Sequence, residues 1–258
     1  MKVLIVHGRY RSVAPSGENR VVDQEAAALL AAGHEVELFQ RNSDDIADWS
    51  VVRKAALPAQ SVWNGRARDE LSRRLASTRP DVVHVHNTFP LISPSVLHAC
   101  RDATTPVVAT IHNYRLLCAG GGFFRDGKPC HDCLDGPGIQ ALQHGCYRGS
   151  RLATLPVAVN LALHRSAWQE LVSAYIFLSA SQRDLMKDLA LPEERVFVKH
   201  NLVPPVPPRT DDETAEHMVL YLGRLDAPKG APLLMRSWDV FRDRILDQRD
   251  GRRHGLHL

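Results

Sequence analysis

A short segment near the C-terminal end of the sequence combines the residue types that bind phosphate groups. Residues 219–235 read VLYLGRLDAPKGAPLLM, so Gly223 and Arg224 follow an apolar run and Lys229 comes shortly after. A guanidinium offers a planar fork of donors and an ammonium offers a mobile charge, a combination suited to a diphosphate. Glycine lets the backbone approach a ligand, and a helix that begins near Lys229 would add its N-terminal amides. The segment predicts a diphosphate-binding turn after a strand, while its spacing alone is also compatible with an ordinary turn that carries solvated charges.

Metal binding is the chemistry suggested by four cysteines that fall within one long loop. Their spacing is C-x11-C-x2-C-x12-C, and the residues are Cys118, Cys130, Cys133 and Cys146. Four thiolates around a central C-x-x-C suit a tetrahedral structural zinc ion, and His131 or His144 could replace one ligand. Reduced thiols that pack the loop and a pair of disulfides are the alternatives. Cys100, by contrast, comes at the end of a predicted helix and is expected in the core.

Three histidines accompany two apolar runs that read as strands. His84 and His86 alternate within DVVHVH and therefore share one face of a strand, where packing is the expected role. His86 is close enough to the end of that strand to approach a ligand cleft. His112 directly follows PVVATI, at the end where parallel sheets bind their ligands. A histidine at this position is commonly structural, so its type alone does not establish a site.

The order of the elements around these residues is typical of an α/β protein. Short runs rich in Val and Ile predict strands at 2–6, 34–39, 81–86, 106–111, 174–179 and 195–199. Segments of helical periodicity lie between most of them. The alternation predicts a Rossmann-like parallel sheet with helices on both faces, which binds ligands beyond the carboxyl ends of its strands. The first strand is followed by HGRYRSVAPSGEN and not by a Gly-x-Gly-x-x-Gly turn, which argues against a nucleotide-dependent oxidoreductase.

A proline-rich stretch divides the chain. Prolines at 204, 205, 207 and 208 resist both helix and central strand, so a linker is expected at 204–217. We expect an N-terminal domain at 1–203, with a Cys-rich loop at 112–150, and the first βα unit of a second, incomplete Rossmann-like domain at 218–258. From Arg242 onward the sequence is rich in Arg and Asp and poor in apolar residues. This tail is the expected sign of a truncation or frameshift, or of a disordered end.

Composition places the protein among ordinary globular chains. Of its 258 residues, 44% are apolar and 24% are charged, and the net charge is +3. No basic stripe with interleaved aromatic residues is present, so nucleic acid is not an expected partner. The N-terminal apolar run is too short for a signal peptide, and no run is long enough to span a bilayer. The expected location is the cytoplasm, where the cysteines would be mostly reduced or metal-bound.

Seven stretches occur in an order that resembles a known family. They are the loop around Gly17, AAGHEVELF, PDVVHVHN, TIHNY, FLSASQRDLM, VKHN and YLGRLDAPKG. Together they resemble family 4 of the retaining glycosyltransferases, which have the GT-B fold, over about residues 1–240. The resemblance implies two Rossmann-like domains that face each other across a cleft. It also implies a nucleotide-diphospho-sugar donor held mainly by the C-terminal domain and an acceptor held mainly by the N-terminal one.

The resemblance assigns roles to individual residues. Arg224 and Lys229 would neutralise the donor diphosphate as it leaves. His112 corresponds to the family's histidine at the transferred sugar and is the expected catalytic residue. Gly17 belongs to a loop expected near the acceptor or a phosphate, where Ser16 replaces the second glycine that family members commonly have. Family 4 enzymes are not thought to need a metal for transfer, so zinc in the Cys-rich loop would be structural.

The implied activity is retaining transfer of a hexose to a glycan or lipid-linked acceptor in the synthesis of cell-envelope polysaccharide. Apolar side chains beside Arg151 and Arg165 are compatible with peripheral association at the inner face of the membrane. Family members carry a pair of glutamates in the donor domain, whereas no glutamate follows Glu216 here. A chain truncated early in that domain is therefore expected, with weak or absent activity alone. The alternative is a non-catalytic remnant domain that binds an acceptor or depends on a partner chain.

Overall fold

The computed structural model describes residues 1–13, 16–134, 138–203 and 220–254. The chain divides into two compact units, one of residues 1–123 and 131–204 and the other of residues 124–130 and 205–258. The linker predicted at 204–217 lies outside the described residues, and the predicted domain boundaries on either side of it stay a prediction. Among the described residues, no helix is both long and apolar enough to cross a membrane.

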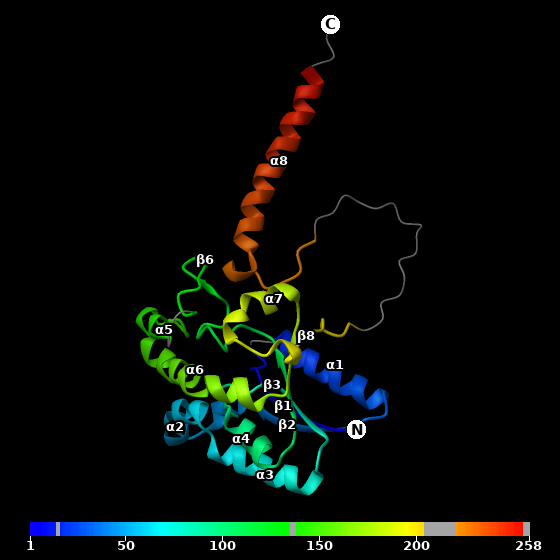
Figure 1. Cartoon of the computed structure of the whole chain (residues 1–258). Helices are drawn as coiled ribbons and strands as arrows, with labels where there is room; N and C mark the ends of the chain where they lie inside the picture. The colour runs from blue at the N-terminus through cyan, green and yellow to red at the C-terminus, as the bar shows by residue number, and fades with distance from the viewer. Residues whose placement is uncertain (14–15, 135–137, 204–219, 255–258) are drawn as a thin grey trace. The chain divides into compact units, whose positions relative to one another are not determined.

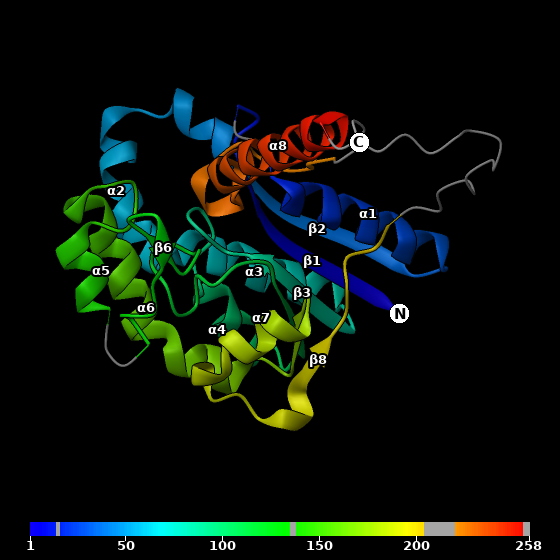
Figure 2. The same cartoon turned by 90° about the horizontal axis from the view of Figure 1, so that it is seen from above.

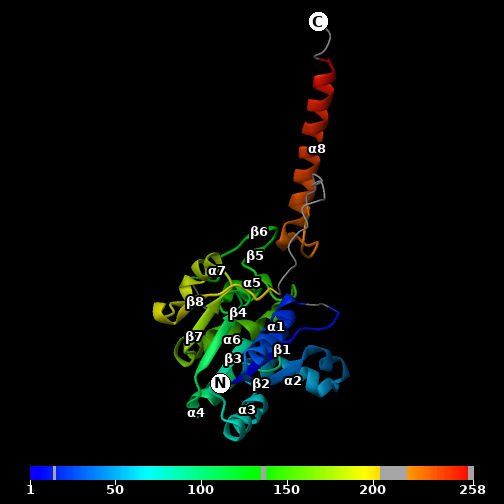
Figure 3. The same ribbon diagram turned by 90° about the vertical axis from the view of Figure 1, so that its right-hand side faces the viewer.

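The first unit is built around a six-stranded sheet in which every neighbouring pair is parallel. Its order is β2-β1-β3-β4-β7-β8, and the strands lie side by side in Figure 3. Their bounds are Lys2–Arg9 (β1), Glu35–Asn42 (β2), Val82–Asn87 (β3), Val107–Ile111 (β4), Ala174–Phe177 (β7) and Val196–Val198 (β8). The predicted α/β fold with a Rossmann-like parallel sheet is therefore confirmed, and each predicted strand of this unit is present.

Helix α1, Gly17–Ala31, covers one face of the sheet and lies along β1 and β2 in Figure 2. It begins at Ser16, whose hydroxyl oxygen accepts a hydrogen bond from the amide of Glu18 at 3.2 Å. One turn apart, Val22 and Ala26 pack against apolar side chains of β1 in a small core cluster. Just beyond its C-cap, Gly33 has φ +82°, the left-handed conformation that glycine adopts most readily.

The other face of the sheet is covered by a larger group of helices (Figure 1). Leu71, Val96 and Trp168 project from three of them into the main core, against Leu4 and other strand residues. The helices of this unit beyond α1 are Val51–Val62 (α2), Gly65–Thr78 (α3), Ser95–Asp102 (α4), Ile139–His144 (α5), Arg151–Leu171 (α6) and Ala180–Leu185 (α7). Short 3-10 helices span Ser43–Asp48 (η1), Lys187–Leu189 (η2) and Glu193–Arg195 (η3).

The second unit contains a short hairpin and one long helix among its described residues. The hairpin pairs Phe124–Arg125 (β5) with Lys128–Pro129 (β6), and a 3-10 helix, Ala227–Lys229 (η4), precedes Ala231–His254 (α8). Of the predicted βα unit, the helix is present. The strand predicted before Gly223 is absent from the described residues 220–222, and no ladder among the described residues includes them.

Of the two alternatives for the segment after Arg242, the disordered end is wrong as far as His254, since α8 continues through it. Arginine, leucine and glutamine are good helix formers, and Gly251 is the single strong helix breaker between Pro232 and His254. Helix propensity therefore outweighs the lack of an apolar stripe over these residues.

Substitution of Leu71, which is fully buried in α3, tests the main core. We expect Leu71→Ala to lower the free energy of unfolding by about 2–5 kcal/mol, because it removes buried methyl groups and leaves a cavity. Urea unfolding followed by tryptophan fluorescence measures this change. Leu152→Ala is the matched control, since Leu152 is 85% exposed and its truncation should change stability by less than about 0.5 kcal/mol. Equal losses in the two variants would contradict this placement of α3.

Candidate functional site

Four histidines gather where β1, β3 and β4 end. On the face covered by α1, β1 presents Val3 and Ile5 and then His7, while His84 and His86 occupy alternate positions of β3. From β1 the chain adds β2 on one side, and it then adds β3 on the other side. The position between β1 and β3 is therefore the switch point at which parallel α/β sheets form their ligand crevice. The apolar face thus becomes polar toward the edge where ligands bind.

Hydrogen bonds hold each imidazole of this histidine cluster in place. His86 Nδ1 lies 2.9 Å from His112 Nε2. His84 Nε2 lies 2.8 Å from the hydroxyl of Thr110, and His7 Nε2 lies 2.9 Å from the side-chain oxygen of Asn19 on α1. The rings of His84 and His86 also pack at 4.2 Å between centroids. The predicted shared face of His84 and His86 is confirmed, and His86 directly contacts the predicted catalytic residue, His112.

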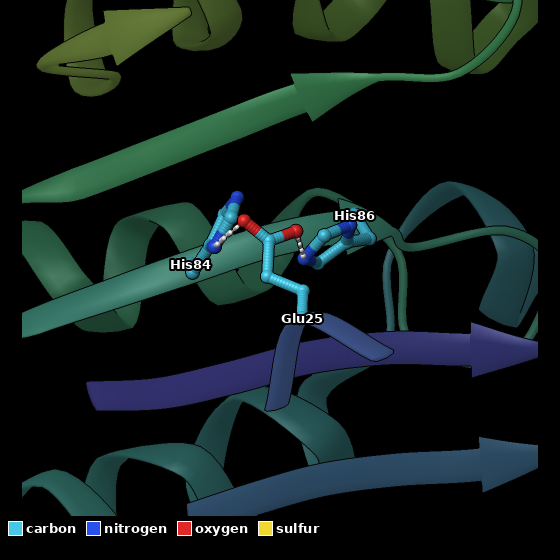
Figure 4. Close-up of side chains that lie close together, drawn as sticks. All are labelled: Glu25, His84 and His86. Atoms are coloured by element: carbon cyan, nitrogen blue, oxygen red, sulfur yellow. Dashed lines mark ion pairs between the residues drawn. The ribbon is translucent and has the colours of Figure 1, made fainter. Parts of the chain in front are cut away.

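A carboxylate from α1 completes the histidine cluster. In Figure 4 the carboxylate of Glu25 lies between the two β3 histidines, with one oxygen 4.0 Å from His84 Nδ1 and the other 3.7 Å from His86 Nε2. Lys199, just after β8, pairs with the same carboxylate at 3.1 Å. Ligand atoms of Glu25, His84 and His86 all lie within 4.8 Å of one another, so these side chains could hold a metal ion, although the ammonium of Lys199 already supplies a positive charge there.

Burial keeps the histidine cluster uncharged. It lowers the pKa of His7, His84 and His86 below their ordinary value, and it lowers the pKa of His112 to about 4. Burial is the largest cause in each case, because it disfavours the charged imidazolium. At neutral pH each ring therefore offers one N–H donor and one acceptor nitrogen.

A small cavity of about 60 Å³ opens beside His86 and His112. Its wall includes Asn113 and Arg115 from the segment after β4, and Asn160 from α6. This volume exceeds the roughly 10–15 Å³ that one bound water molecule needs. The guanidinium of Arg115 lies over the ring of Phe89 at 4.8 Å, which fixes one wall of the cavity.

The predicted acceptor or phosphate loop lies at the start of α1. Ser16 caps the helix and Gly17 is its first residue. A Cβ added at Gly17 would meet no atom of the described residues within 4 Å, so packing among them does not require glycine there and its approach to a ligand stays a prediction. The adjacent Glu18 is buried, which raises its pKa to about 7 despite a hydrogen bond from Tyr10. Sequence reasoning missed Glu18, because an acidic residue in a first helical turn is common for helix stability alone.

In the second unit, the residues predicted to bind a diphosphate form an ordered turn. The hydroxyl of Tyr221 lies 2.9 Å from the carbonyl oxygen of Arg224 and 3.2 Å from that of Lys229. Asp226 accepts a hydrogen bond from the amide of Lys229 and pairs with Arg224 Nε at 3.0 Å. The helix predicted near Lys229 is confirmed as η4 followed by α8. A diphosphate role for Gly223 and its two basic neighbours stays a prediction.

The Cys-rich loop is divided between the two units. Cys118, Cys133 and Cys146 are partly buried and pack against apolar clusters of the first unit, whereas Cys130 belongs to the second. None of the cysteines, all of which are among the described residues, forms a disulfide. The four-sulphur zinc site stays a prediction. Cys100 is fully buried as expected, and burial raises the pKa of its thiol to about 12.

Comparison with known proteins identifies the family. The sequence profile of Glycosyltransferase Family 4 matches residues 15–206, which are 192 of the 258 residues. The chain belongs to Glycosyltransferase Family 4. The matched part of this family 4 chain includes His84, His86 and His112, whereas Arg224 and Lys229 lie outside it. A search of curated proteins found no match.

Several solved structures are similar to the family 4 chain at low identity. Staphylococcus aureus MnaA with UDP shares 10% identity, with 78% of this chain and 44% of that one covered and a TM-score of 0.42. The lipopolysaccharide outer core galactosyltransferase WaaB in its apo form shares 14%, with 83% and 51% covered and a TM-score of 0.42. Anabaena Alr3699/HepE with UDP shares 15%, with 78% and 44% covered and a TM-score of 0.35. The chain spans about half the length of these structures.

Acid should destabilise this family 4 protein through its buried histidines. An unfolded histidine titrates near 6.5, whereas His112 in the fold titrates near 4, so between these values the unfolded chain binds more protons. Stability contributed by His112 is therefore present above pH 6.5 and is lost as the pH falls toward 4, by roughly 3 kcal/mol at about 1.4 kcal/mol per pH unit. Urea unfolding from pH 7.5 to 4 measures this slope.

His112→Gln should flatten that pH dependence, because it removes one of the groups that titrate differently in the two states. The matched control is His144→Gln, which changes an exposed imidazole and should keep the wild-type slope. Identical slopes in the wild type and in His112→Gln would contradict a neutral, buried His112.

Proposed function

We propose that this protein is a glycosyltransferase that transfers a hexose from a nucleotide-diphospho-sugar to a glycan or lipid-linked acceptor with retention of configuration. The observation that carries the proposal is the family match over residues 15–206. That match covers β3 and β4, which position His84, His86 and His112, and it covers the cavity at the carboxyl edge of the sheet.

His112 is the proposed catalytic residue. It lines the cavity at the end of β4 and is neutral at physiological pH, because burial lowers its pKa to about 4. A neutral imidazole with one nitrogen engaged by His86 retains one nitrogen for a sugar hydroxyl. The proposed role is therefore to bind and orient the transferred sugar at the reacting centre.

Arg224 and Lys229 are proposed to neutralise the donor diphosphate as it leaves. The side chain of Arg224 is 71% exposed, and Asp226 contacts it through Nε, the inner nitrogen of the guanidinium. The outer edge of the guanidinium is thus accessible to a bidentate anion. No metal takes part in the proposed transfer, as the family resemblance implies.

The acceptor is proposed to lie at the cytoplasmic face of a membrane, in the synthesis of cell-envelope polysaccharide. Helix α6 supports this proposal, because Leu152 is 85% exposed and Leu163 is 64% exposed, close in sequence to Arg151 and Arg165. Exposed apolar side chains mixed with cationic ones are typical of helices that bind anionic lipid surfaces.

Donor binding is the first test, by calorimetric titration of the purified chain with UDP, GDP, ADP and their hexose conjugates. One nucleotide sugar should bind saturably, and replacing Arg224 and Lys229 together with Gln should weaken binding about 10- to 100-fold, because charge-assisted hydrogen bonds to the diphosphate are lost. Arg236→Gln is the control, since it removes an exposed charge from α8 in the same unit. Unchanged affinity in the double variant would refute the diphosphate site.

Turnover with the nucleotide sugar that binds tests catalysis separately. We expect His112→Gln to lower kcat by about 100-fold or more with little change in donor affinity, because it removes a group that acts at the reacting centre. His144→Gln should leave kcat unchanged. The anomeric configuration of the product, read by NMR, tests retention. Saturable donor binding without transfer to any glycan or lipid-linked acceptor would favour a non-catalytic binding module.

A further inference from the structure

Three side chains form a continuous polar chain from α1 to the end of β4. Glu25 Oε2 lies 3.7 Å from His86 Nε2, and His86 Nδ1 lies 2.9 Å from His112 Nε2. Both ring nitrogens of His86 are thus used within the protein, one toward a carboxylate and one toward another imidazole. The contacts of His86 therefore influence which ring nitrogen of His112 carries the proton.

The contact between His86 and His112 holds a single proton. Burial lowers the pKa of both rings, so both are neutral at physiological pH and each carries one N–H. At 2.9 Å one nitrogen must donate and the other must accept. Two arrangements satisfy this rule: His112 donates through Nε2–H, or His86 donates through Nδ1–H.

The carboxylate of Glu25 distinguishes between these two arrangements. His86 Nε2 is buried and has no hydrogen-bond partner among the described residues, so the nearby carboxylate dominates its surroundings. If His86 donated through Nδ1–H, its Nε2 lone pair would point toward an anion in a poorly solvated site. If His86 carries its proton on Nε2, a positive N–H faces that anion instead. Electrostatics therefore favours Nε2–H on His86, which makes its Nδ1 the acceptor.

The other charged and titratable groups near Glu25 are compatible with this choice. Lys199 keeps the carboxylate paired at 3.1 Å, and His84 faces the other carboxylate oxygen at 4.0 Å. The ring of His7 packs edge-on against His86 at 6.2 Å. Both histidines have a pKa lowered by burial, so neither adds a positive charge that would reverse the preference.

We propose that Glu25 and His86 are positioning residues that hold His112 as the tautomer protonated on Nε2. Glu25 fixes the proton of His86 on Nε2, His86 then accepts from His112, and His112 keeps its Nδ1 as an acceptor nitrogen. This inference rests on the proposed function only for its effect on sugar transfer, since the tautomer itself is a property of the free protein.

A metal ion held by Glu25, His84 and His86 is the competing use of the same atoms. The separations of 3.7 and 4.0 Å are wider than the roughly 3.4 Å between neighbouring ligands of a tetrahedral zinc ion with bonds of about 2.0–2.1 Å. A second positive charge beside Lys199 would also be repelled. The tautomer chain needs neither an ion nor a rearrangement.

Long-range proton–nitrogen NMR of the 15N-labelled full chain measures the tautomer, because a protonated ring nitrogen and a lone-pair nitrogen resonate far apart. The signals of His112 are identified as those missing from the spectrum of His112→Gln. At pH 7.5 we expect the Nε2–H form of His112 to exceed the other at least about tenfold in the wild type. In Glu25→Met, which removes the anion, the ratio should fall to within about threefold of equality.

Two further variants distinguish the effect of the Glu25 anion from a general effect of substitution on the fold. Glu25→Asp keeps the anion and should retain the wild-type tautomer, whereas Glu35→Met removes an exposed carboxylate elsewhere and should change nothing. A predominantly Nδ1–H form of His112 in the wild type would overturn the inference, as would a tautomer ratio unaffected by Glu25→Met. Stoichiometric loss of the His84 and His86 signals on addition of micromolar Zn²⁺ would also overturn it, in favour of a metal site.

The tautomer and the proposed function can fail independently. If the NMR result is as expected but no nucleotide sugar binds, the positioning chain stands and the glycosyltransferase proposal fails. If donor binds and is turned over while the tautomer is unaffected by Glu25→Met, the function stands and the inference fails.

Discussion

The site depends on keeping several imidazoles uncharged beneath one helix. A buried polar group destabilises the fold unless it finds a hydrogen-bond partner. Here one ring nitrogen of each β-strand histidine has a hydrogen-bond partner: Thr110 for His84, His112 for His86 and Asn19 for His7. A proton added to any ring would place a charge in poorly solvated surroundings next to its neighbours. The pKa values of these histidines are lowered together for that reason, and the site works as a network of neutral donors and acceptors.

Helix α1 is the element that positions this network. Its Val22 and Ala26 pack on the apolar part of β1, and these contacts set where the helix lies on the sheet. The same helix then places Asn19 against His7 and Glu25 against the β3 histidines, because these residues lie within a turn of the apolar pair. The helix that packs on the core thus also carries the polar side chains of the network, so the geometry of the network follows from that of the core.

Much of the fold was predictable because its signals are local. Short runs rich in Val and Ile predicted the six strands of the first unit, and the place of His112 after a strand follows directly from one of these runs. Helix α2 was not predicted, because the strong helix breaker Pro58 lies within it. Its start depends on Ser50, whose hydroxyl accepts from the amide of Arg53.

The part of the site that could not be predicted depends on distant contacts. Glu25 is one of several charged residues on α1, and a charge on a helix normally faces solvent. Its carboxylate is instead largely buried and is paired with Lys199, 174 residues later. No local pattern contains that pairing. The His84 and His86 alternation was visible, but a packing role was the better expectation as long as neither the carboxylate nor His112 could be placed beside them.

The neutrality of the histidine cluster limits what it can contribute to the proposed reaction. A neutral imidazole orients a hydroxyl through hydrogen bonds, but it offers little stabilisation to a departing diphosphate, whose charge grows as the bond to the sugar breaks. That charge needs permanent cations. In the proposed reaction they are supplied by Arg224 and Lys229 of the second unit. In the proposed reaction a histidine would orient the sugar and the two cations would bind the diphosphate, so loss of a histidine should affect turnover, whereas loss of a cation should already affect donor binding.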